Sequence, residues 1–228
     1  MKVIIEGEHV KLVEEKIAAQ CTLTTYLSQI LKHMPVSTGL LPAGIIFYAS
    51  GKNTKWYLFE VTPRTLDISY KSRRSNTATK HTVSIPYVYA LITTVDDIIE
   101  EQGIKFFCNT QRIDKMDDPI FRTPFLNIYD QGSGNVCLGS MRVDPDTPIT
   151  QRIRAVLDTF FLSVFNDDLS PAWPAEFSSI AEWEKLTQKN PLCALACTYV
   201  PWVREKPVTL KDFLKTEFER YGDEHEFF

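Results

Sequence analysis

The chain has 228 residues, of which 44% are hydrophobic and 24% are charged. This composition is typical of a folded globular protein and excludes disorder, collagen or a coiled coil as the main architecture. The net charge of −4 disfavours a nucleic-acid-binding protein that depends on neutralising phosphates. The longest uncharged apolar stretch, residues 82–95, is shorter than the roughly 20 residues of a membrane-spanning helix.

The number of cysteines indicates in which cellular compartment the protein is expected. An odd number of cysteines in a long chain does not fit the disulfide framework of a secreted protein. Charged residues interrupt the start of the chain, so no signal peptide is expected there. We therefore expect a cytoplasmic protein with free thiols and with neither nucleic acid nor membrane as a partner. The five thiols are Cys21, Cys108, Cys137, Cys193 and Cys197.

Hydrophobic periodicity, together with capping and turn residues, predicts the helices and strands of the chain. A helix over 22–34 ends at Pro35, and the helices over 179–189 and 210–220 each begin with a capping pair, Ser179/Glu182 and Thr209/Asp212. Strands are predicted at 2–5, 43–49, 55–61, 65–70, 81–85 and 104–109, with a hairpin turn at 50–53. The longest helix is predicted over 148–165.

The order of these elements is a helix, a block of strands, a long loop and then helices. Such segregated blocks favour an α+β fold with an antiparallel meander over a βαβ fold. The long loop, at about 110–146, is of a length that is often functional. A second loop, 71–80, is basic and acid-free; it suits an anionic partner or, more simply, a solvated hairpin tip.

Metal and cofactor chemistry finds little support in the sequence. The four histidines are scattered, and Cys193 and Cys197 have no second ligand pair at zinc spacing. No glycine-rich phosphate loop lies between a strand and a helix. We expect neither a bound cofactor nor a metal.

The segment 123–139 carries the candidate chemistry, because an asparagine and a cysteine follow one another in the long loop. A cysteine thiolate can accept an acyl group. An asparagine amide can stabilise the oxyanion that forms in acyl transfer. Cys137 and Asn127 suit these two roles. Taken alone, the pair is more typical of a packed cysteine and a turn-forming asparagine than of a catalytic pair.

The wider pattern resembles the active-site signature of ubiquitin-conjugating enzymes. Asn127-Ile128-Tyr129 matches the Asn-Ile-Tyr part, Gly132 falls in the following turn, and Val136-Cys137-Leu138 matches the cysteine part. The usual His-Pro is replaced by Phe125-Leu126, and the turn is two residues longer than is usual. The pattern of Pro124 followed by Phe125-x-Asn127-x-Tyr129 and then Val136-Cys137-x-Gly139 resembles a prokaryotic branch, family D, that includes protein B of the PRTRC gene systems. The resemblance covers roughly residues 20–190.

This resemblance implies a ubiquitin-conjugating fold with an N-terminal helix, an antiparallel meander, a long active-site loop and C-terminal helices. It implies that Cys137 carries a ubiquitin-like protein as a thioester, delivered by an adenylating enzyme and passed to a protein amine. Asn127 would stabilise the oxyanion. Asp167 and Asp168 would help to orient and deprotonate the attacking lysine, or would simply be a solvated pair at a helix end.

The sequence is compatible with two other functions. The same fold can be an inactive module that binds a ubiquitin-like protein or its activating enzyme. The chain can also be a structural or regulatory component of a mobile-element or defence system. The expected organisation is a conjugating domain over 1–190 with an N-terminal strand, followed by a helical extension and an acidic tail over 191–228.

Overall fold

The computed structural model describes residues 44–129, 133–137, 139, 147–203 and 206–222, and the backbone of three N-terminal strands. The chain divides into two compact units, Met1–Gly39 and Leu40–Glu226. In the first unit, β1 (Lys2–Glu6), β2 (His9–Val13) and β3 (Ile17–Thr22) form an antiparallel sheet in that order. The predicted strand at 2–5 is confirmed. The predicted helix at 22–34 lies, beyond Thr22, outside the described residues.

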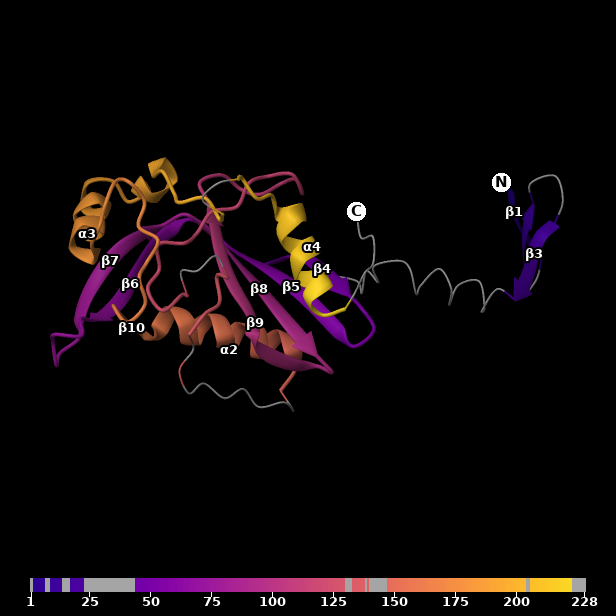
Figure 1. Ribbon diagram of the computed structural model, residues 1–228, viewed down its shortest axis with the longest axis horizontal. Coiled ribbons are helices and arrows are strands. Elements are labelled where there is room, and N and C mark those ends of the chain that lie inside the picture. Colours follow the sequence, from indigo (N-terminus) through magenta and orange to yellow (C-terminus); the bar gives the residue numbers. More distant parts are fainter. Residues whose placement is uncertain are drawn as a thin grey trace. The chain divides into compact units, whose positions relative to one another are not determined.

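The larger unit contains seven strands and three α-helices in its described part (Figure 1). The strands are β4 (Ile45–Ser50), β5 (Thr54–Val61), β6 (Arg64–Lys71), β7 (Thr79–Ile85), β8 (Tyr87–Val95), β9 (Ile98–Asn109) and β10 (Val164–Asn166). The α-helices are α2 (Ile149–Leu162), α3 (Ile180–Lys189) and α4 (Leu210–Arg220), with a 3-10 turn at Cys193–Ala196. None of these helices is long and apolar enough to span a membrane.

One long antiparallel ribbon organises this unit. β5 pairs with β8, and β6 pairs with β7, in a single continuous register that places Pro63 opposite Pro86. Proline has no backbone N–H to donate to the ladder, so the facing prolines divide the ribbon into two pairs. β4 and β9 complete a four-stranded antiparallel sheet in the order β4-β5-β8-β9. β10 joins the other pair in the order β10-β6-β7.

Helices cover both faces of the four-stranded sheet. Adjacent residues of β9 point to opposite faces: the Phe106 ring lies 4.5 Å from that of Phe160 in α2, and the Phe107 ring lies 5.1 Å from that of Phe213 in α4. Figure 1 shows α2 and α4 on opposite sides of the strands. α3 packs beside β7, where the indole N–H of Trp183 donates to the Ser84 carbonyl over 2.8 Å.

The expected antiparallel meander and late helices are present, with three corrections. The strand β8 was not predicted, because its apolar run does not alternate. The longest helix ends at Leu162, not at 165, since Val164–Asn166 pairs in parallel with β6. Part of the predicted irregular loop is also ordered as a short hairpin. The Ser179 and Thr209 side chains each accept a backbone N–H three residues on, so both N-caps are confirmed. The reciprocal bond of a capping box is present for Thr209 and Asp212, whereas the Glu182 carboxylate accepts from the Ser178 N–H instead.

Candidate active site

The candidate nucleophile lies on a short hairpin that is added to the edge of the sheet. Ile128 pairs with Val136, and the Cys137 N–H donates to the Asn127 carbonyl over 2.8 Å. Asn127 and Cys137 are therefore directly opposite each other on paired segments. Directly opposite residues of an antiparallel pair have Cβ atoms roughly 5 Å apart. The fold thus brings together two residues that are ten apart in sequence.

The side chain of Asn127 binds the chain that follows α2. Its Nδ2 donates to the Val164 carbonyl over 3.2 Å, and its Oδ1 accepts from the Asn166 N–H over 3.2 Å. The residue is buried and adopts a φ of 63°, a left-handed conformation that asparagine tolerates better than most residues. The amide thus fastens β10 to the hairpin. Because an amide nitrogen carries two hydrogens, the bond to Val164 leaves one for another acceptor.

Exposure separates Cys137 from the other cysteines whose side chains are described. Cys137 is exposed, whereas Cys108, Cys193 and Cys197 are buried. Burial raises the pKa of the Cys108 thiol well above its usual value and raises that of Cys197 to about 12. Thiols that are buried and protonated are poor nucleophiles. Cys21 lies in β3, in the other unit, where only the backbone is described.

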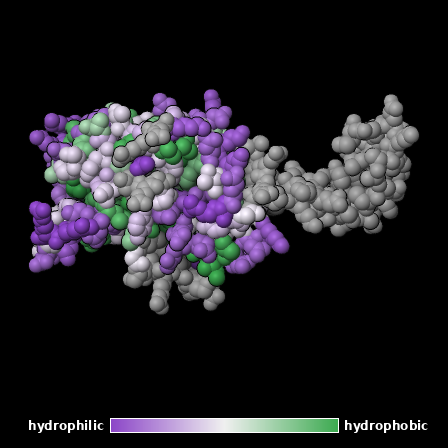
Figure 2. All heavy atoms as spheres, in the orientation of Figure 1, coloured by the Kyte–Doolittle hydropathy of each residue, from purple (hydrophilic) through white to green (hydrophobic). Residues whose placement is uncertain are grey.

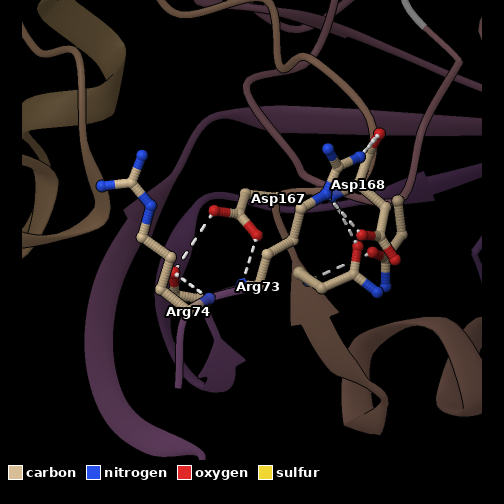
Figure 3. A network of polar contacts seen from close by, with 7 residues as sticks. Arg73, Arg74, Asp167 and Asp168 are labelled. Carbon is tan, nitrogen blue, oxygen red and sulfur yellow. Dashed lines mark hydrogen bonds and ion pairs between the residues drawn. The ribbon is translucent and has the colours of Figure 1, made fainter.

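The two candidate acids are bound to the tip of the β6–β7 ribbon (Figure 3). Asp167 accepts from the Arg73 backbone N–H over 2.7 Å, and Asp168 pairs with the Arg73 Nε over 2.7 Å. The Arg73 N–H bond keeps the pKa of Asp167 below its usual value. The acids follow β10 directly, one residue beyond the Asn166 N–H that binds Asn127. In the described part of the chain, the hydrogen bonds of their carboxylates lead to Ser72 and Arg73 and not to Cys137.

The basic loop is therefore partly neutralised. Arg73 is engaged with the acids, while Arg74 is exposed. In Figure 2, hydrophilic side chains gather at the left-hand end of the molecule, where Figure 1 places the tip of β6 and β7. The loop has its own acidic partners within the chain, which favours the hairpin-tip interpretation.

An apolar depression adjoins the hairpin. Ile128, Tyr129 and Gly134 contribute the hairpin side, and Phe125 and Trp202 contribute two of the aromatic walls. Tyr129 is 47% exposed at its edge. The described residues contain no cluster of three or more His, Cys, Asp or Glu side chains suited to a metal ion.

A buried lysine lies directly behind the hairpin and was not identified from the sequence. The Lys105 side chain is only 1% exposed, and its Nζ lies 3.0 Å from the Glu217 Oε1 of α4. The signal was a single charged residue within the apolar strand Ile104-Lys105-Phe106-Phe107. Lysine is almost never fully buried unless it is paired.

Comparison with known proteins gives one family match. The model of prokaryotic E2 family D matches residues 23–190, nearly three quarters of the chain. The chain belongs to this family. It is a ubiquitin-conjugating-like protein, and members of such families act with a ubiquitin-like protein and its activating enzyme. No curated protein and no solved structure shows a significant match. The family match includes the Cys137 hairpin, α2 and β10, and it ends just beyond α3.

Proposed function

We propose that this family D protein carries a ubiquitin-like protein as a thioester on Cys137 and transfers it to an amine. The supporting observation is the hairpin that presents an exposed Cys137 opposite a buried, hydrogen-bonded Asn127. The other three cysteines with described side chains are buried. We also propose the finer assignment to the PRTRC protein B branch, which the residue pattern of Pro124, Phe125-x-Asn127-x-Tyr129 and Val136-Cys137-x-Gly139 favours.

The reaction divides acyl transfer into two exchanges at one carbonyl carbon. First, the Cys137 thiolate attacks the thioester on the activating enzyme; a new C–S bond forms, the old C–S bond breaks, and the enzyme thiolate leaves. Second, an amine attacks the Cys137 thioester; a C–N bond forms, the Cys137 thiolate leaves, and the amine loses a proton to a base. ATP is consumed upstream, so neither step requires a cofactor on this chain.

We assign Asn127 a double role in this scheme. Its bonds to Val164 and Asn166 fix β10 against the hairpin, and its remaining amide hydrogen can donate to the oxyanion of the intermediate. Asp167 and Asp168 stand at the exit of β10, where they can orient an incoming amine. Their hydrogen bond and ion pair with Arg73 fix the position of the chain just after β10.

The test is reconstitution with the cognate adenylating enzyme, its ubiquitin-like protein and ATP. The expected product is an adduct on this chain that a thiol reductant removes and that Cys137→Ala abolishes. An activating enzyme that is shown to carry its own thioester, yet never charges this chain, would exclude the proposal.

A non-catalytic binding module is the second candidate. The engagement of the Asn127 amide by β10 favours it, because that amide already has a structural task. This candidate predicts that the ubiquitin-like protein or the activating enzyme binds equally well to Cys137→Ala, and that no covalent adduct ever forms.

A further inference from the structure

The strand of the hairpin that leads to Cys137 pairs directly with β9. The Phe106 N–H donates to the Gly134 carbonyl over 2.9 Å, and the Val136 N–H donates to the Ile104 carbonyl over 3.1 Å. Residues 133–137 therefore extend the four-stranded sheet by one short segment. The position of Cys137 depends on how firmly this segment is held, because the thiol lies at its end.

The buried ammonium group of Lys105 reinforces the pairing between residues 133–137 and β9. Lys105 is the β9 residue that bridges to Asn135, and its Nζ donates to the Ser133 carbonyl over 3.3 Å. The same Nζ pairs with Glu217 at 3.0 Å, and both side chains are almost completely buried. The ion pair thus connects α4 to the main chain four residues before Cys137.

A second contact from the same C-terminal region reaches the hairpin. A Cβ atom built on Gly134 would lie 2.2 Å from the Trp202 ring, so the indole is packed directly against this glycine. Trp202 in turn makes a T-shaped, edge-to-face contact with Phe213 of α4, with ring centroids 5.2 Å apart. Trp202 and Glu217 both lie beyond residue 190, where the family match ends.

We propose that Lys105 and Glu217 are positioning residues for Cys137, and that the chain beyond residue 190 is thereby a working part of the site. The role in acyl transfer rests on the proposed function; the role in holding the hairpin does not. Neither residue touches the reacting atoms. They act by fixing the Ser133 carbonyl and, through it, the strand that ends at Cys137.

The chemistry of the pair favours positioning over stability alone. Burying two charges is costly, and well-packed apolar side chains of similar volume often replace a buried ion pair with no loss of stability. An apolar side chain cannot, however, donate to the Ser133 carbonyl. An ammonium has three donors, so it can bind Glu217 and Ser133 at the same time.

The experiment compares amide hydrogen exchange in the full chain and in Lys105→Met/Glu217→Met, which removes both charges and roughly conserves volume. The amides of Val136 and Cys137 should exchange at least about tenfold faster in the double variant, while those of β5 and β8 should be unchanged. Glu217→Gln, which conserves shape and weakens the pair, should give a smaller increase at the same amides. If the double variant does not fold, the exchange rates of the Val136 and Cys137 amides in Glu217→Gln alone test the proposal.

Thr209→Ala is the matched control, because it removes the capping box of α4 without touching the attachment of Lys105 to Ser133. It should lower the thermal midpoint and leave hairpin exchange close to that of the natural protein. Unchanged hairpin exchange in the double variant and in Glu217→Gln, or an equal rise throughout the sheet, would overturn the proposal.

The rate at which the activating enzyme transfers the ubiquitin-like protein to Cys137 (charging) measures the effect of the pair on function. The single-turnover rate on Cys137 should fall about tenfold in the double variant, with an unchanged KM for the activating enzyme, because a small misplacement of a reacting group slows its reaction steeply. Fast local exchange with no charging, even of the natural protein, would leave the hairpin role intact and exclude the proposed function. Fast local exchange with charging at the natural rate would exclude the positioning role.

Discussion

Asn127 and Cys137 lie opposite each other on the two strands of the hairpin, and the Cys137 N–H donates to the Asn127 carbonyl over 2.8 Å. The contact is made by backbone atoms, so it survives substitution of either side chain. The Asn127 amide is therefore available for a second purpose, and it binds both Val164 and Asn166 of β10. One residue thus joins the strand that follows α2 to the hairpin that carries the thiol.

The first prediction concerns stability at Asn127. Asn127→Ala should lower the free energy of unfolding by roughly 1–3 kcal/mol, because two buried backbone groups of β10 lose their partner. Urea denaturation measures the change. Asn127→Gly is the control for the backbone, since glycine accepts the φ of 63° without strain. A stability for Asn127→Ala equal to that of the natural protein would show that the amide bonds do not hold β10.

A comparison of two glycines tests the packing of Trp202. Both Gly134 and Gly139 have φ values near +60°, but a Cβ at Gly139 would meet nothing within 4 Å. Gly139→Ala should therefore cost only the conformational penalty, about 1–2 kcal/mol. Gly134→Ala should cost roughly 2–4 kcal/mol, because it adds a clash with the indole. Equal losses in unfolding free energy would show that Trp202 does not press on the hairpin.

The interaction of Asp167 with Arg73 at the tip of the β6–β7 ribbon predicts that the thermal stability of the protein depends on pH. Its pKa is lowered in the folded state by the Arg73 N–H, so its contribution to stability is present above the unfolded pKa of about 3.9 and is lost as the pH falls through the folded-state value. Asp167→Asn should thus lower the thermal midpoint at pH 7, and the difference from the natural protein should narrow as the pH falls below about 3.9. Asp158→Asn, at an exposed position on α2, is the control for the loss of one surface charge. A constant gap from pH 7 to pH 3 would rule out this contact.

Thiol labelling tests the separation of the cysteines. In a Cys21→Ser background, iodoacetamide at neutral pH should modify the folded chain once, at Cys137, because Cys108, Cys193 and Cys197 are buried. Denaturation should expose all four remaining thiols. Intact-mass measurement before and after denaturation gives both counts, and Cys137→Ser supplies the blank. Rapid modification of Cys108 or Cys197 in the folded chain would contradict the described burial.

The elements that could be predicted from the sequence are those with local signals. Two helices were placed by their capping pairs, and the β4–β5 hairpin by its turn residues. β8 has no alternating pattern, because it lies in the middle of the sheet and is buried on both faces. The end of α2 was misplaced because Val164 and Phe165 continue the helical period, while pairing with β6 draws them into a strand.

The candidate site was accessible to sequence reasoning only in part. Asn127 and Cys137 were found through the signature, and the structure places them opposite each other. The ties between the two acids and Arg73 span more than ninety residues, and no local pattern encodes them. The same holds for Lys105 and Glu217, where a lone charge in an apolar strand indicates that a partner exists without identifying it.

The most direct test of the central claim is to locate the bond between this chain and the ubiquitin-like protein. The activating enzyme, ATP and the ubiquitin-like protein are mixed with the natural chain and with Cys137→Ser, and the adducts are analysed by intact mass with and without a thiol reductant. We predict a reductant-sensitive adduct on the natural chain, and with Cys137→Ser a reductant-resistant ester or no adduct. A reductant-sensitive adduct of equal yield on Cys137→Ser, or none on the natural chain beside a fully charged activating enzyme, would contradict the account.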